Sequence, residues 1–194
     1  MRVISGKAKG RRLSSVPGDT TRPITDRTKE ALFDILGGDV DGSSWIELFA
    51  GTGSVGIEAL SRGAKYVCFV DKNPNAIATI KKNLEMTGVV DRGAGQDFRV
   101  LRMDSFSILG KIDMGKFDYI FVAPPQYKDM WKRALIALDS CPDWFATNAW
   151  VIVQINPIEI ERIELKTLNQ FDTRRYGSTM LVFYAFQGEV AKGS

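Results

Sequence analysis

Three glycines and one acid have the residue types and spacing of a nucleoside-binding site. Gly51, Gly53 and Gly56 stand in "ELFAGTGSVG", directly after an apolar run and at the start of an amphipathic one. A turn of this kind brings backbone amides and a helix N-terminus close to a ligand. Asp71 ends the next apolar run, where a carboxylate can accept hydrogen bonds from both hydroxyls of a ribose. The glycines alone fit a packing turn equally well, but together with Asp71 they predict nucleoside binding.

Two further acids indicate which nucleoside is bound. Glu47 precedes Gly51 by four residues, and a carboxylate facing the ligand's entry suits a positively charged ligand and repels a pyrophosphate. Asp104 follows the third apolar run, where it can meet an adenine amino group, although a solvated loop acid is an equally good interpretation. Together these acids favour S-adenosylmethionine over a nicotinamide dinucleotide.

Composition excludes several other chemistries. The chain contains no histidine, and Cys68 and Cys141 are far apart without a CxxC spacing, so zinc sites and histidine-based triads are excluded and no metal is expected. No apolar run is long enough to cross a bilayer, and no apolar signal region follows the basic N-terminus. We therefore expect a cytoplasmic protein without a membrane partner.

The elements that must position these residues alternate between apolar strands and amphipathic helices. Strands are predicted at 44–50, 66–71, 97–104, 117–123 and 149–155. Helices are predicted within 24–38, with Thr25 or Asp26 as cap and Gly37 as stop, and at 54–63, 73–88 and 129–138. Because these strands lack polar alternation, they predict a parallel sheet covered on both faces. Two later strand-like runs, 160–171 and 179–186, are joined by "DTRRYGS" and must pair antiparallel. The expected fold is α/β, with a doubly wound, mostly parallel sheet that ends in an antiparallel hairpin.

The chain of 194 residues, 44% of them hydrophobic, is expected to form one compact domain at 24–194, preceded by a basic arm at 1–23. Residues 1–33 hold eight Lys or Arg against three acids, while the whole chain carries a net charge of +3. A solvated, partly disordered terminus is the simpler interpretation, but so local an excess favours a polyanionic partner. The candidate RNA-binding residues are Arg2, Lys7, Lys9, Arg11, Arg12, Arg22 and Arg27.

Longer motifs narrow the function. The stretches "RVISGKAKGRRL", "TRPITDRTKEALFDIL", "ELFAGTGSVGIEALSRGA" and "YGSTML" resemble the bacterial ribosomal RNA guanine-N2 methyltransferases of the RsmD type. The resemblance covers nearly the whole chain. It implies a Rossmann-like class I methyltransferase that uses S-adenosylmethionine and modifies the N2 amine of a guanine in 16S ribosomal RNA of the small subunit, as a monomer. It also implies that the stretch containing Arg22, Thr25 and Arg27 folds over the cofactor and faces the RNA.

The same resemblance implies a catalytic edge after the fourth strand, where these enzymes carry a D/N-P-P-aromatic motif. An exocyclic amine conjugated with its ring is a poor nucleophile, so acceptors must hold it in line with the sulfonium methyl. In the family, the first residue supplies a side-chain oxygen, the first proline a backbone carbonyl, and the aromatic a stacking face for the flipped base. This chain has Ala123, Pro124, Pro125, Gln126 and Tyr127 there. Because Ala123 has no acceptor, we expect Gln126 to supply the missing oxygen and Tyr127 to stack on the guanine.

Three alternatives remain open. A DNA adenine or cytosine amino-methyltransferase would use the same motif, but the chain has no additional target-recognition domain. An NAD-dependent oxidoreductase would share the glycine turn and Asp71, without explaining the proline pair or the basic arm. An RNA-binding protein with a vestigial pocket is a third possibility because of Ala123.

Overall fold

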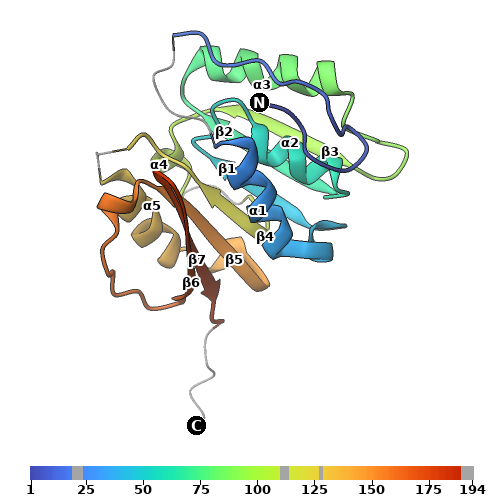
Figure 1. The fold of residues 1–194 in the computed structure, drawn as a ribbon. Coiled ribbons are helices and arrows are strands. Elements are labelled where there is room, and N and C mark those ends of the chain that lie inside the picture. Colours follow the sequence, from blue (N-terminus) through green and yellow to red (C-terminus); the bar gives the residue numbers. More distant parts are fainter. Residues whose placement is uncertain (19–23, 110–113, 127–128, 189–194) are drawn as a thin grey trace.

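A computed structural model describes residues 1–18, 24–109, 114–126 and 129–188 (Figure 1). The helices are α1 (Asp26–Leu36), α2 (Ser54–Ser61), α3 (Pro74–Thr87), α4 (Ser105–Ile108) and α5 (Met130–Asp139), with short 3-10 turns η1 (Gly37–Val40), η2 (Pro142–Trp144) and η3 (Pro157–Glu159). The strands are β1 (Ser44–Leu48), β2 (Tyr66–Asp71), β3 (Asp97–Arg102), β4 (Phe117–Val122), β5 (Phe145–Ile155), β6 (Leu168–Tyr176) and β7 (Thr179–Phe186). None of the helices in the described ranges is long and apolar enough to cross a membrane.

All seven strands form one sheet in the order β3-β2-β1-β4-β5-β7-β6. The first five strands of the chain are parallel, whereas β7 pairs antiparallel with both β5 and β6. The strand order reverses between β1 and β4, and ligands of open α/β sheets bind at the carboxyl edge beside such a reversal. The predicted fold class is confirmed, and the topology directs attention to the loops after β1 and β4.

Each face of the sheet buries its own hydrophobic core. On one face, residues of α1, α2, α3 and the N-terminal segment pack together, including Leu32, Phe33 and Leu60. We call this the α1 face. On the other, the α5 face, α4 and α5 contribute Ile108, Trp131 and Leu135. The central strands are apolar on both sides because both sides are covered.

One predicted strand was wrong. The run 160–171 was expected to pair with the last strand, but β6 spans Leu168–Tyr176 and includes most of the segment expected to be the link. The earlier apolar residues Ile163 and Leu165 instead pack against the core of the α5 face. A tight turn with Gly177 at φ 61° connects β6 to β7, so the antiparallel hairpin itself is confirmed.

The described part of the N-terminal arm packs on the domain. Residues 1–18 lie along α2 and α3 (Figure 1), with Val3, Ala8 and Leu13 buried and one antiparallel bridge between Arg2 and Arg12. The apolar side chains explain why this basic segment is folded against the domain, since their burial favours docking. The boundary at residue 23 stays a prediction.

Candidate nucleotide-binding and methyl-transfer site

The glycine turn after β1 has the predicted close geometry. Gly51 has φ 54° and Gly53 has φ 71°, values that side chains other than glycine rarely adopt. Gly56 lies in α2 against the sheet, where an added Cβ would stand 2.4 Å from the Phe69 ring. The start of α2 therefore packs closely against the sheet at Phe69, and the backbone of the glycine turn lies at the carboxyl edge of the sheet.

Glu47 lies beneath this turn, buried, and does not face a ligand entry. Its Oε2 accepts a hydrogen bond from Gly56 N at 2.9 Å. Burial raises the pKa of Glu47 to about 8, while backbone N–H groups of Gly56 and Val55 oppose the rise. The carboxyl group thus occupies first-turn amides of α2 that would bind a pyrophosphate in a dinucleotide site.

Asp71 ends β2, and Asp104 follows the end of the neighbouring strand β3 at the same edge of the sheet. Asp71 accepts hydrogen bonds from Gly51 N at 2.9 Å and from Asn73 N at 2.8 Å, which links the ends of β1 and β2. A carboxylate has about four acceptor positions, so two remain for ribose hydroxyls. Asp104 caps α4 by accepting from Phe106 N and lies 3.8 Å from the Lys72 ammonium. Both acids are half-buried, and the structure brings them to one edge with the glycine turn.

The proposed catalytic segment follows β4 at that edge. Ala123 donates its backbone N–H to Leu48 O at 3.4 Å, so this segment starts beside the end of β1. Pro124 is buried, while Ala123, Pro125 and Gln126 are half-buried. Tyr127 lies outside the described residues, as does Arg22. The hydrogen bond from Ala123 to Leu48 O and the sheet order therefore place the start of the candidate catalytic segment beside the end of β1, from which the glycine turn follows.

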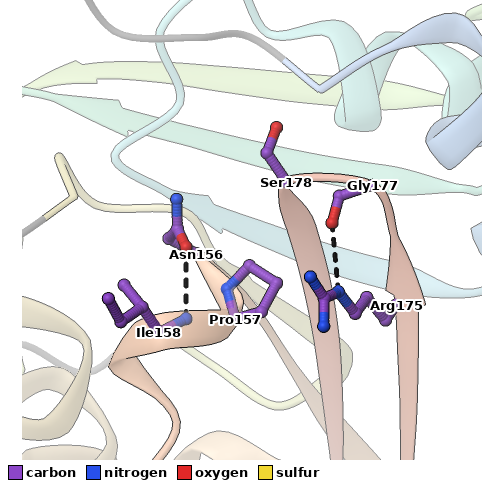
Figure 2. A pocket seen from close by; sticks show the side chains of 6 residues that line it. All are labelled: Asn156, Pro157, Ile158, Arg175, Gly177 and Ser178. Carbon is purple, nitrogen blue, oxygen red and sulfur yellow. Dashed lines mark hydrogen bonds between the residues drawn. The ribbon is translucent and has the colours of Figure 1, made fainter.

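A pocket of about 610 Å³ opens one strand away from this segment (Figure 2). It lies between the end of β5 and the β6–β7 turn and is lined by Asn156, Pro157, Ile158, Arg175, Gly177 and Ser178. Arg175 donates to Gly177 O at 3.2 Å. Within the ranges that the structure describes it forms no ion pair, whereas Arg174 pairs with Asp172 at 2.8 Å. Sequence reasoning did not foresee this pocket.

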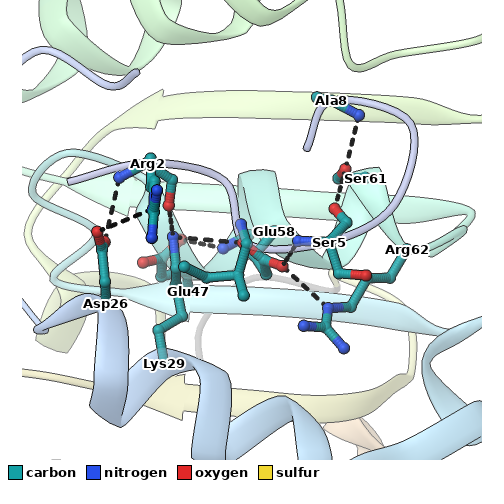
Figure 3. A network of polar contacts seen from close by, with 11 residues as sticks. Arg2, Ser5, Ala8, Asp26, Lys29, Glu47, Glu58, Ser61 and Arg62 are labelled. Atoms are coloured by element: carbon teal, nitrogen blue, oxygen red, sulfur yellow. Dashed lines mark hydrogen bonds and ion pairs between the residues drawn. The ribbon is translucent and has the colours of Figure 1, made fainter. Parts of the chain in front are cut away.

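A buried polar network holds the N-terminal arm in place (Figure 3). Glu58 of α2 accepts from Ile4 N at 2.7 Å and from Ser5 N at 2.9 Å. Lys29 of α1 donates to Arg2 O at 2.7 Å and lies 3.4 Å from the Glu58 carboxylate, with both side chains fully buried. Charged groups are rarely buried unless paired, and this pair ties α1, α2 and the arm together.

The candidate RNA-binding cations lie on the outside of this arrangement. Six of the seven are described, and all six are exposed: Arg2, Lys7, Lys9, Arg11, Arg12 and Arg27. Arg2 pairs with Asp26, and Lys7 donates to Gln96, so part of their charge is used within the protein. Thr25 caps α1 by accepting a hydrogen bond from Thr28 N at 3.1 Å. Its predicted contact with a cofactor stays a prediction.

The comparisons with known proteins agree with this geometry. A family model described as "Conserved hypothetical protein 95" matches residues 1–185. The "Putative rRNA methyltransferase YlbH" of Bacillus subtilis (strain 168) is 43% identical over 97% of this chain and its own full length. The "Ribosomal RNA small subunit methyltransferase D" of Haemophilus influenzae is 32% identical over 79% of this chain and 78% of its own. The chain belongs to this family, the RsmD family.

Solved structures share the RsmD-family fold. The "Putative methyltransferase yhhF from Escherichia coli" has a TM-score of 0.80 and 27% identity, with 97% of this chain and 99% of that chain covered. An RNA methyltransferase from Salinibacter ruber in complex with S-adenosyl-L-homocysteine has a TM-score of 0.62 and 14% identity, with 89% and 98% covered. The second likeness shows the fold, and the predicted Rossmann-like class I methyltransferase architecture is confirmed.

Two features of this RsmD-family site were not predicted from the sequence. Phe49 adopts φ 60° between β1 and the glycine turn, a strained conformation of the kind that clusters at functional sites. Asn83 of α3 donates to both Ser14 O and Thr52 O, so it joins the arm to the glycine turn. Neither role has a signal in the sequence, because both depend on contacts between distant segments.

In the ranges described here, no group of three or more potential ligands is arranged to hold a metal.

Proposed function

We propose that this protein is an S-adenosylmethionine-dependent methyltransferase that modifies the N2 amine of a guanine in 16S ribosomal RNA. The observation that carries the proposal is family membership along almost the whole chain, together with a site whose glycine turn, Asp71 and proline pair meet at one sheet edge. The relative from H. influenzae is named a small-subunit ribosomal RNA methyltransferase. We therefore infer that the small ribosomal subunit, or its RNA, is the partner. We also propose that the protein acts as a monomer.

The residues at the carboxyl edge fit S-adenosylmethionine. Asp71 keeps acceptor capacity toward a ribose, and the glycine turn, which has no side chains at Gly51 and Gly53, lets a ligand approach the backbone. Glu47 occupies the α2 amides, which disfavours a dinucleotide. When bound, S-adenosylmethionine supplies an electrophilic methyl group on a sulfonium. The S. ruber methyltransferase that shares the fold was solved with the demethylated product of that cofactor.

The chain's own residues must orient the amine and accept its proton. Pro124 fixes φ and presents its carbonyl in a set direction after β4. Its position beside the end of β1 places it next to the glycine turn. With no histidine in the chain, positioning by backbone and amide oxygens carries the chemistry, with proton release to solvent after transfer.

The exposed arm cations predict salt-sensitive binding to RNA. Lys9, Arg11 and Arg12 form no ion pair in the described ranges, so they can neutralise phosphates. Replacing all three by glutamine is expected to weaken binding of small-subunit RNA and to reduce its dependence on salt. The slope of log binding constant against log salt falls by up to ~0.7 to 0.9 for each phosphate that is no longer neutralised. Lys116→Gln, an exposed control just before β4, should leave the slope unchanged; equal slopes in both variants contradict the RNA role of the arm.

Transfer of a labelled methyl group to ribosomal subunits tests the proposal directly. The protein is incubated with labelled S-adenosylmethionine and small subunits from cells that lack this modification, and the modified base is mapped. We expect one product at a guanine N2. Product on an adenine, or on DNA in a parallel reaction, would favour the amino-methyltransferase alternative, and no product on any substrate would overturn the enzymatic assignment. The change in melting temperature on adding S-adenosylmethionine or NAD distinguishes a methyltransferase from the NAD-dependent oxidoreductase alternative.

A further inference from the structure

Gln154 is a buried amide whose oxygen has no partner. The residue lies near the end of β5 and is 8% exposed. Its Oε1 is fully buried and forms no hydrogen bond with any residue in the described ranges. An unpaired acceptor in a protein interior destabilises the folded state, and such groups are rare enough to need an explanation.

The sheet register places Gln154 beside Ala123. Val122 of β4 and Val153 of β5 are partners, so the next residues of the two parallel strands are neighbours, with Cβ atoms about 5 Å apart. Both side chains lie on the same face. Ala123 packs against the core of the α1 face, and Gln154 shares that face with Ile152, because side chains alternate along a strand.

Ala123 is also where the methyl-transfer motif lacks its acceptor. Methyl transfer to guanine N2 requires an oxygen that accepts an N–H of the amine and holds its lone pair toward the methyl group. An alanine methyl cannot do this. A carboxamide on the adjacent strand can, because rotation about its last side-chain bond exchanges the positions of its oxygen and its amino group.

We propose that Gln154 supplies the acceptor that Ala123 lacks and binds the exocyclic amine of the target guanine. This inference rests on the proposed function. It explains why β5 carries a polar side chain at a buried position beside Ala123, and why the oxygen of that side chain has no partner among the described residues. It also differs from the sequence-based expectation, which assigned the same task to Gln126 on the loop after β4.

Replacing Gln154 by leucine separates a substrate contact from a structural role. Leucine is of similar size and cannot accept a hydrogen bond. We expect kcat for methyl transfer to undermethylated small subunits to fall by about 10- to 100-fold, with unchanged affinity for S-adenosylmethionine. The melting temperature should rise by roughly 2–4 °C, because the variant no longer buries an unpaired acceptor. Gln170→Leu, at an exposed position on β6, is the matched control and should change neither quantity.

A second substitution tests the partnership with Ala123. Ala123→Asn in the Gln154→Leu background restores an acceptor from the neighbouring strand and should recover most of the lost kcat. If the wild-type protein is active and Gln154→Leu changes kcat by less than twofold, the proposed role of Gln154 is wrong, while the proposed function stands. The same holds for a loss of activity that comes with a lower melting temperature and is not recovered by Ala123→Asn. If the wild-type protein has no activity, the proposed role of Gln154 is also wrong. If the Ala123→Asp variant is then active, the proposed function is retained, but Gln154 does not supply the acceptor.

Discussion

Replacing Glu58 by leucine is expected to lower the free energy of unfolding by about 3–5 kcal/mol. The fully buried carboxylate accepts from two arm amides, Ile4 N and Ser5 N, and pairs with the ammonium of Lys29. It also accepts from Arg62 Nε at 2.9 Å. Leucine leaves the two arm amides without this acceptor and the buried Lys29 ammonium without its counter-charge, and the cost of an unpaired buried charge exceeds any gain in apolar packing. Urea denaturation at neutral pH measures the change.

Two further variants show whether the loss comes from the buried charge. Glu85→Leu makes the same change at an exposed position of α3 and should alter the unfolding free energy by no more than about 0.5 kcal/mol. Lys29→Met in the Glu58→Leu background removes the unpaired ammonium and should recover part of the stability. Equal losses in Glu58→Leu and Glu85→Leu contradict the role assigned to the network.

The effect of Glu58 is expected to extend to both functional surfaces. Glu58 lies in α2, the helix that starts at the glycine turn, and the same helix ends at Ser61, whose hydroxyl accepts from Ala8 N and donates to Ser5 O (Figure 3). The short helix therefore connects the arm that carries the basic residues with the turn that faces the cofactor edge. Loss of the network should increase hydrogen exchange at the Ile4 and Ser5 amides before the whole domain unfolds.

The parts of the fold that were predictable are those that depend on local pattern. The strands β2 and β7 were predicted with their observed bounds, 66–71 and 179–186, because each is a continuous apolar run between turn residues. The mostly parallel, doubly wound architecture followed from the alternation of strands and helices. β6 was misplaced because it is an exposed edge strand with the polar sequence "LNQFDTRRY", while the apolar residues before it belong to a loop that covers the core.

The site was predictable only where a motif marks it. Gly51, Asp71 and Pro124 are visible as residue types at fixed distances from strand ends. Glu47 was expected to face the ligand, since a sequence cannot show that its carboxyl group turns inward to the α2 amides. The burial of Lys29 contradicts the ordinary preference of lysine for the surface, and Gln154 is hidden in an apolar strand. These three positions depend on contacts between segments that are distant in the chain.

Glu47 should make the stability of the protein depend on pH. Burial raises its pKa in the folded state to about 8 from an ordinary value of 4.5, so between these values the folded protein holds a proton that the unfolded chain has released. The free energy of unfolding therefore falls as pH rises from about 4.5 to 8, by at most ~1.4 kcal/mol per pH unit, and levels off above the folded-state pKa. The total contribution is on the order of 4–5 kcal/mol.

Glu47→Gln isolates this contribution. Glutamine still offers an oxygen to Gly56 N, the bond that Glu47 makes at 2.9 Å, but it does not ionise. Denaturation of both proteins at a series of pH values between 4.5 and 9 should give similar stabilities at the acid end and a growing advantage for the variant toward pH 8. The difference between the two curves removes the contribution of every other titrating group, because both proteins share them. Parallel curves would mean that Glu47 is ionised in the folded protein throughout this range, with the two backbone N–H groups and Lys29 outweighing its burial.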